Sequence, residues 1–196
     1  MILFISILFY KNVNGDFSLI PSFVFNPGQT RQVLWVDYDN DGDNDLFITA
    51  TNGLARLLNN DGLFNFTDVS IAAGLSGFNT NNFGVSFGDY DRDGHLDFYL
   101  ARYSMTGNVN DPNQTNALYK NNGDGYFTDV ALAAGLSEPI ATMGCNFGDL
   151  DNDGFLDFYL ATGDPELFSI VPNRMYRNNM GIKFEDVTYT GGFGHL

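Results

Sequence analysis

The chain has 196 residues, 44% of them hydrophobic, so it can build a core and wholesale disorder is excluded. Its formal net charge of −15 would be repelled by phosphate backbones and by acidic lipid surfaces, which argues against a nucleic-acid partner. No apolar run reaches the ~18 residues that membrane insertion needs. Only three of the 24 acidic residues are Glu, and 22 residues are Gly, a composition that favours turns and strands over helices.

The first predicted element is the apolar run at residues 2–9, which has two interpretations. It could be the core of a signal peptide, but no basic residue precedes it and no small-residue cleavage site follows, so a signal peptide is not evident. It could instead be a buried strand leading into a hairpin at residues 10–17, where Asn-Gly supplies turn chemistry. We favour the strand, and we assign residues 1–31 to the end of a preceding repeat unit.

Three repeat units follow, at residues 32–82, 83–142 and 143–192, and residues 193–196 resemble the start of another. The residue pattern of each unit predicts a strand, an Asp-rich loop, an apolar strand, a connection and a hairpin with an Asn/Asp/Gly turn. Four short strands repeated every 50 to 60 residues or so are typical of β-propeller blades. We therefore predict an all-β fold of about three full blades with partial blades at both ends. Because a ring needs about four to eight blades, we expect the remaining blades on a longer chain, or a partner that closes the ring.

The Asp-rich loops share the pattern D-x-D-x-D-G-x-x-D, which suits a metal ion. Carboxylates at positions 1, 3, 5 and 9 converge if the backbone curls at the position-6 glycine, and position 7 would offer its backbone carbonyl. An oxygen-only cage of this kind selects Ca²⁺ over Mg²⁺, so we predict three Ca²⁺ sites. The candidate ligands are Asp37, Asp39, Asp41, Asp43 and Asp45; Asp89, Asp91, Asp93, His95 and Asp97; and Asp149, Asp151, Asp153, Phe155 and Asp157.

Two other interpretations of these loops are less favourable. An EF-hand needs a bidentate Glu at position 12, where this chain has Ile48, Leu100 and Leu160. Plain acidic surface turns would not be expected to place four Asp at the same positions three times. The ion would act as a structural staple between two strands and not as a catalyst.

A few further side chains have simple structural interpretations. We expect the side chain of His95 to be exposed, because position 7 would bind through its backbone. We expect Cys145 and Trp35 to lie in the core. The acidic residue that ends each hairpin is predicted to hydrogen-bond the adjoining turn: Asp68, Asp129 and Asp186.

The repeated motifs resemble those of FG-GAP/VCBS repeat proteins, the family of the integrin α-subunit propellers. The resemblance is carried by Phe83-Gly, Phe87-Gly-Asp-Tyr-Asp-Arg-Asp-Gly, Phe147-Gly-Asp-Leu-Asp-Asn-Asp-Gly and the Asn-Asn hairpins, and it covers about residues 8–196. It is closest to the group that includes cartilage acidic protein and proteins with an ASPIC/UnbV domain. The resemblance implies Ca²⁺ in the Asp loops and a role in adhesion or ligand binding. The first unit departs from the pattern, since Gln32–Val36 replaces the Phe-Gly strand.

The predicted function is a non-catalytic, calcium-binding module for extracellular binding or adhesion, with a protein or glycan ligand of unknown identity. The expected location is extracellular, at the cell surface or periplasmic. The alternative is part of a propeller enzyme acting on polysaccharide, with its site in missing blades or in the connections at 102–116 and 162–173. Those connections hold Asp111, Asp164, Glu166 and Tyr103 but neither His nor Lys.

Overall fold

The computed structural model describes residues 7–25, 29–51, 55–75, 82–102, 115–163 and 172–192. These residues form three four-stranded antiparallel sheets, one two-stranded hairpin and a single turn of helix. The hairpin is β1 (Ile7–Val13) with β2 (Asp16–Phe25), and the first blade is β3 (Gln29–Val36), β4 (Asp45–Thr51), β5 (Arg56–Asn60) and β6 (Phe66–Asp68). The second blade is β7 (Asn82–Gly88), β8 (Asp97–Arg102), β9 (Ala117–Asn121) and β10 (Phe127–Asp129), followed by α1 (Ala131–Ala134). The third blade is β11 (Thr142–Gly148), β12 (Asp157–Thr162), β13 (Arg174–Asn179) and β14 (Lys183–Asp186).

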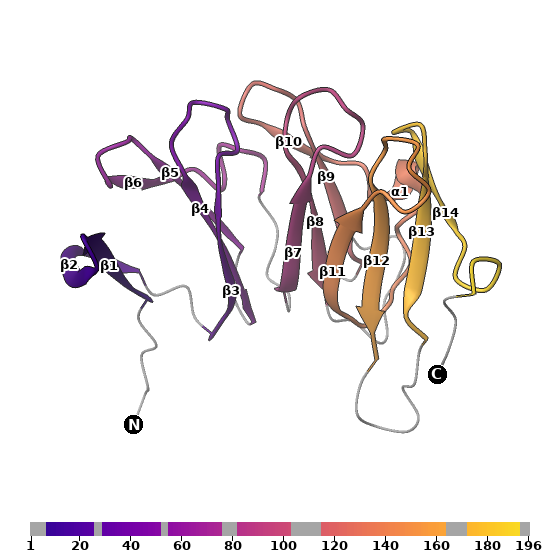
Figure 1. The fold of residues 1–196 in the computed structure, drawn as a ribbon, viewed down its shortest axis with the longest axis horizontal. Coiled ribbons are helices and arrows are strands. Elements are labelled where there is room, and N and C mark those ends of the chain that lie inside the picture. The colour runs from indigo at the N-terminus through magenta and orange to yellow at the C-terminus, as the bar shows by residue number, and fades with distance from the viewer. Residues whose placement is uncertain are drawn as a thin grey trace.

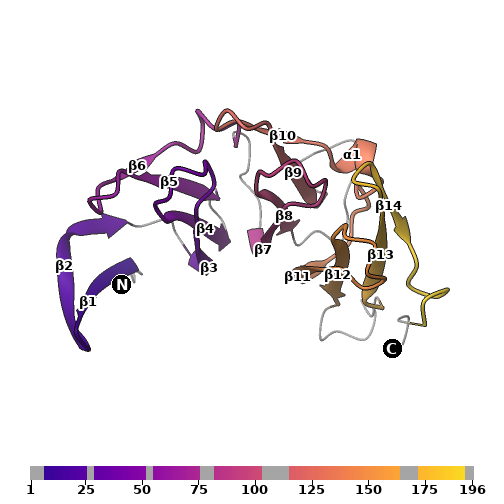
Figure 2. The same ribbon diagram turned by 45° about the horizontal axis from the view of Figure 1, so that its top comes forward.

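Each blade is an antiparallel meander in which sequential strands are neighbours. The blades stand side by side along an arc, with β3, β7 and β11 on the concave side and β6, β10 and β14 on the convex side (Figures 1 and 2). The all-β fold of propeller-type blades predicted from the repeat is therefore confirmed. Residues 193–196 lie outside the described residues, and the blade boundaries drawn from the sequence remain a prediction. In the part of the chain that is described, no helix is long and apolar enough to cross a membrane.

The three blades share their register as well as their strand order. The first strand is irregular near its start in every blade, and its last residue pairs with the Asp that opens the second strand: Val36 with Asp45, Gly88 with Asp97 and Gly148 with Asp157. Each Asp loop is thus closed at its base by strand pairing. The loop and the β5–β6, β9–β10 or β13–β14 turn lie at the same edge of their sheet (Figure 1).

The hydrophobic core lies between blades, because each sheet buries its apolar side chains against its neighbour. One cluster joins Phe47 of the first blade to Phe98 of the second, with ring centroids 5.0 Å apart. Another joins Tyr99 of the second blade to Phe158 of the third at 4.1 Å. Edge-to-face and tilted ring pairs of this kind add to the stabilisation by apolar burial. A blade is therefore stabilised chiefly by its neighbours.

In the second blade the glycines of the Phe-Gly strand lie close to the third blade, whereas a Cβ at Gly148 of the third blade would meet nothing within 4 Å. A Cβ at Gly88 would lie 2.8 Å from the Cδ1 of Leu156 in the third blade. The first blade has no Phe-Gly strand and uses Gln32 instead, whose side chain accepts from the backbone N–H of Val85 at 2.8 Å. Its amide also donates to the Val85 carbonyl at 3.3 Å. The departure noted in the sequence is therefore matched by a polar contact to the next blade.

The N-terminal hairpin is confirmed from Ile7 onward, with Tyr10 opposite Leu19 and Val13 opposite Asp16. The expectation of a buried strand is wrong for its described part, because Leu8 is exposed and its neighbours in β1 are at most partly buried. The prediction that Trp35 lies in the core is wrong, since half of its surface is exposed. Alternation along β3 places Leu34 and Val36 against the second blade, and Trp35 on the opposite face. There its ring lies 5.7 Å from that of Phe9 in β1, so it covers the hairpin junction instead.

Candidate metal sites

The three Asp loops have the same backbone geometry, set by the Asp at position 1. In the second loop the two carboxylate oxygens of Asp89 accept hydrogen bonds from the backbone N–H groups of Asp93 and Gly94, each at 3.0 Å. Asp37 and Asp149 make the same pair of bonds in the other loops. The position-6 glycine has φ of 90° or slightly more in all three loops, a conformation that disfavours any side chain.

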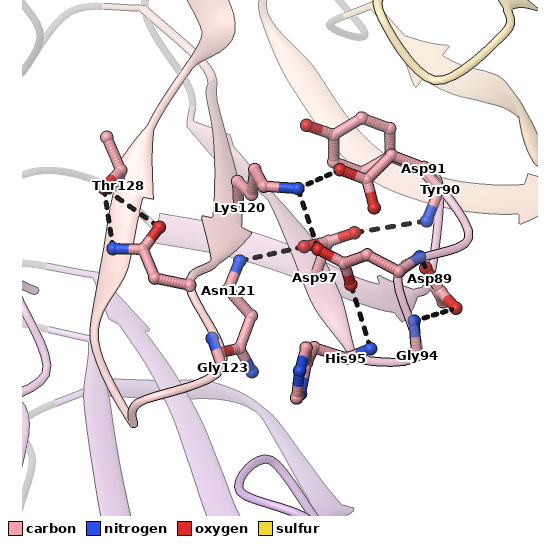
Figure 3. A network of polar contacts seen from close by, with 12 residues as sticks. Asp89, Tyr90, Asp91, Gly94, His95, Asp97, Lys120, Asn121, Gly123 and Thr128 are labelled. Carbon is pink, nitrogen blue, oxygen red and sulfur yellow. Dashed lines mark hydrogen bonds and ion pairs between the residues drawn. The ribbon is translucent and has the colours of Figure 1, made fainter.

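The Asp at position 9 is buried and ties the loop to the hairpin of its own blade. Asp97 accepts from the backbone N–H of Tyr90 at 3.2 Å and from that of Asn121 at 2.8 Å (Figure 3). Asp45 and Asp157 repeat this arrangement. Burial raises the pKa of Asp45 to about 6 and that of Asp97 to about 7, and the neighbouring loop acids act in the same direction. A positive charge nearby would favour the ionised form of Asp45 and Asp97.

Carboxylate oxygens from each loop gather closely enough to share one ion. In every loop, three acidic groups each offer an oxygen atom, and these atoms lie within 4.8 Å of one another. The groups are Asp37, Asp39 and Asp41; Asp89, Asp91 and Asp97; and Asp149, Asp151 and Asp157. Positions 1 and 3 are thus brought together in all three loops, with position 5 or position 9 as the third member. Asp45, Asp93 and Asp153 are not in these groups, and whether they complete the cages remains a prediction.

The second loop offers a direct test of whether a cation fits. The Oδ1 atom of Asp91 is buried and has no hydrogen-bond partner among the described residues, although it lies among the carboxylates of its own loop. A buried, unpartnered carboxylate oxygen is costly, and a metal ion is the kind of ligand that would satisfy it. The oxygen-only donor set suits a hard divalent cation such as Ca²⁺. The residues present therefore fit such an ion.

The side chains at position 7 connect neighbouring loops. The Nδ1 atom of His95 lies 3.3 Å from the Nδ2 atom of Asn40, which is at position 4 of the first loop. The guanidinium of Arg92, at position 4 of the second loop, lies 5.3 Å from the ring centre of Phe155. The expectation of an exposed His95 side chain is therefore wrong, because the imidazole is half-buried against the preceding loop. A metal-binding role for the backbone carbonyls of Asp43, His95 and Phe155 remains a prediction.

The sequence analysis did not identify the hairpin Asn of the second and third blades as the residue that links each of these blades to the preceding one. The Nδ2 atom of Asn121 donates to the carbonyl of Tyr38, in the loop of the preceding blade, at 2.8 Å. Asn178 donates in the same way to the carbonyl of Tyr90 at 2.9 Å. Beside these bonds, Phe127 packs on Tyr38 and Phe184 on Tyr90. The recurrence of Asn-Asn in the hairpins was the available signal, but it gave no indication of the partner.

Other predicted residues have structural roles. The acidic residues that end the hairpins each accept a hydrogen bond from the backbone two residues on, as predicted: Ser70 to Asp68, Ala131 to Asp129 and Thr188 to Asp186. Cys145 is half-buried by the second core cluster, and burial raises the pKa of its thiol to about 12, so the thiolate is disfavoured.

A cavity of about 350 Å³ lies beside the third loop, lined in part by Leu150, Tyr176 and Val187. Leu150 occupies position 2 of its loop, where Tyr38 and Tyr90 are each covered by a phenylalanine of the following blade. The cavity therefore lies at the position in the repeat that a phenylalanine covers at the other two loops.

Together, the meander sheets, the cores between them and the acidic loop at the same place in each sheet define an all-β repeat protein of propeller-type blades. The family model described as "FG-GAP-like repeat" matches residues 37–100 and 106–160. The chain belongs to the FG-GAP-like repeat family. It is similar to cartilage acidic protein 1 of Xenopus tropicalis, with 29% identity over 142 residues. The match covers 70% of this chain and 20% of that relative, so the chain spans about a fifth of the relative's length.

Proposed function

We propose that this chain is a non-catalytic, calcium-binding FG-GAP module in which each Asp loop binds one Ca²⁺. The observation that carries the proposal is the threefold recurrence of a loop whose acidic oxygens lie within 4.8 Å of one another. Position 1, position 3 and the buried position 9 would supply carboxylates in every loop, with positions 5 and 7 completing the shell. The bound ion would help to fix the conformation of the loop, together with the strand pairing at its base and the turn at its glycine.

The chemistry that Ca²⁺ supplies here is charge compensation. Asp45, Asp97 and Asp157 each fasten a loop to the hairpin of the same blade, and each lies among other acids of its loop. Like charges at this spacing repel strongly in a partly buried site. A bound divalent ion would offset that repulsion and hold the first two strands of the blade in register with its hairpin.

We also propose that the module works outside the cytoplasm, where millimolar Ca²⁺ suits sites of this type. Family membership and the similarity to a cartilage acidic protein support an extracellular, cell-surface or periplasmic setting, and a protein or glycan ligand. In this setting the loops would shape a binding surface that the ion stabilises, as the integrin-like resemblance suggests. The remaining blades of a longer chain would complete that surface.

The enzyme alternative depends on the connections between the second and third strands of a blade. Residues 103–114 and 164–171, with Asp111, Asp164, Glu166 and Tyr103, lie outside the described residues. No specific contact favours this alternative over the binding module.

Calorimetric titration of the metal-free chain with Ca²⁺ tests the proposal, and the expected stoichiometry is three. Asp39→Asn removes a position-3 carboxylate whose hydrogen-bond partner is the Asn59 amide, and it should reduce the stoichiometry to two or strongly weaken one site. The matched control is Asp124→Asn, an exposed acid in the turn of the second blade, which should leave three sites. A wild-type stoichiometry of zero or one would refute the proposal.

A further inference from the structure

The three loops differ at one neighbouring position, immediately before the hairpin Asn. This position holds Asn59 in the first blade, Lys120 in the second and Arg177 in the third. In the first blade it supplies a neutral amide, since the Nδ2 atom of Asn59 donates to Asp39 at 3.0 Å and to Asp45 at 3.4 Å. The side chain at this position thus reaches the carboxylates that would bind the ion.

In the second blade the same position places a full positive charge among those carboxylates. The ammonium of Lys120 bonds to Asp91 and lies 2.8 Å from an oxygen of Asp93 (Figure 3). Its cross-strand partner is Thr128, which is uncharged and whose hydroxyl is hydrogen-bonded to Asn122. The loop carboxylates are therefore the acceptors available to this ammonium, and they are already partly neutralised before any metal binds.

In the third blade the charge is paired first with an acid outside the loop, although Asp151 and Asp157 of the loop also act on it electrostatically. The cross-strand partner of Arg177 is Glu185, and the guanidinium bonds to its carboxylate at 2.8 Å. This pair is half exposed, so it is not a strong structural bond, but it gives Arg177 an acceptor other than the third loop. The acids of the third loop are therefore less occupied by this charge than those of the second loop are by Lys120, whose ammonium bonds to them directly.

We infer that this position sets the cation affinity of each loop, so that the second site binds Ca²⁺ more weakly than the first and third. The inference rests on the proposed function. A Ca²⁺ ion entering the second loop must displace the Lys120 ammonium from Asp91 and Asp93 and then remain close to it. A charge-assisted pair at a partly exposed site corresponds to a roughly three- to tenfold difference in affinity. The second loop would also keep its shape best when metal is removed, because the ammonium already holds it.

Competition titrations with a chromophoric chelator test the inference, because they give stepwise Ca²⁺ affinities for the whole chain. The wild type should show two tighter sites and one weaker site. Lys120→Asn, which copies the first blade, should strengthen the weak site roughly three- to tenfold. Lys120→Arg keeps the charge and should leave that site weak. Asn59→Lys, the reverse exchange, should produce one tighter and two weaker sites.

A second arm uses the third blade, where Lys120 plays no part. Glu185→Gln removes the competing acceptor of Arg177 and should weaken one tight site, whereas Arg177→Gln should not. Three equal sites in the wild type that Lys120→Asn leaves unchanged would overturn the inference while the proposed function stands. No Ca²⁺ binding by any variant, each confirmed as folded by its melting transition, would overturn both.

Discussion

The hydrogen bond between Asn121 and the preceding loop allows the loss of stability in Asn121→Ala to be predicted. Three backbone groups would lose their partners: the carbonyls of Tyr38 and Leu96, which accept at 2.8 and 3.3 Å, and the N–H of Gly123, which donates at 3.0 Å. A buried polar group without a partner costs ~1–3 kcal/mol. The Tyr38 bond is buried and the other two are partly buried, so we expect a loss of about 2–4 kcal/mol in the free energy of unfolding.

The measurement is equilibrium unfolding in denaturant with Ca²⁺ in excess, together with thermal melting, where this loss corresponds to a decrease of roughly 5–15 °C for a chain of this size. The neighbouring Asn122→Ala is the control, since its exposed side chain bonds only to the Thr128 hydroxyl, and it should change the stability by less than ~0.5 kcal/mol. Asn178→Ala should repeat the effect at the next junction. If Asn121→Ala and Asn122→Ala are equally stable, the linking role of the hairpin Asn is wrong.

Two further predictions concern metal removal and backbone approach. A chelator should lower the melting temperature, because each bound ion stabilises the fold by ~2.7 kcal/mol when free Ca²⁺ is 100 times its Kd. Mg²⁺ at equal concentration should restore little of the lost melting temperature. An unchanged melting temperature would contradict the staple role. Gly74→Ala should destabilise the chain by more than ~2 kcal/mol, because its Cβ would lie 2.6 Å from the carbonyl oxygen of Phe127 in the next blade. Gly125→Ala is the matched control for Gly74→Ala, because Gly125 has the same φ of +81° and its Cβ would meet nothing within 4 Å. It should lower the free energy of unfolding, measured in denaturant, by only ~1 kcal/mol. Equal losses of stability in the two variants would mean that backbone conformation, and not the contact between blades, explains the effect.

The sequence predicted the features that depend on short stretches of chain. The Asp loop, its glycine turn and the hairpins are specified by neighbouring residues, and their threefold repetition identified the blade. Contacts between blades could not be predicted in this way. Trp35 was placed in the core because it is large and apolar, but its direction depends on which face of β3 meets the second blade. His95 was expected to be exposed because position 7 would bind through its backbone, and its side-chain contact could not be foreseen because Asn40 belongs to another repeat.

In the candidate sites, too, the local features could be predicted and the contacts from distant residues could not. Which acids could bind an ion was evident from their spacing, since the carboxylates come from one loop. The charge of Lys120 was equally evident, but its position beside Asp91 follows from the pairing of β9 with β8. A side chain almost 30 residues away in sequence therefore acts on the loop. Spacing alone could not indicate that the three loops differ.

The link from each hairpin Asn gives the row of blades a direction. At both described junctions, the acceptor is a carbonyl of the earlier Asp loop and the donor belongs to the later blade. Because such a bond couples its two partners equally, loosening any loop should weaken the junctions on which that loop or its own hairpin Asn depends, toward either end of the row. A row of units coupled only to nearest neighbours transmits such a disturbance step by step. Loss of Ca²⁺ from one loop would thus loosen the adjacent blades first and the more distant blades last.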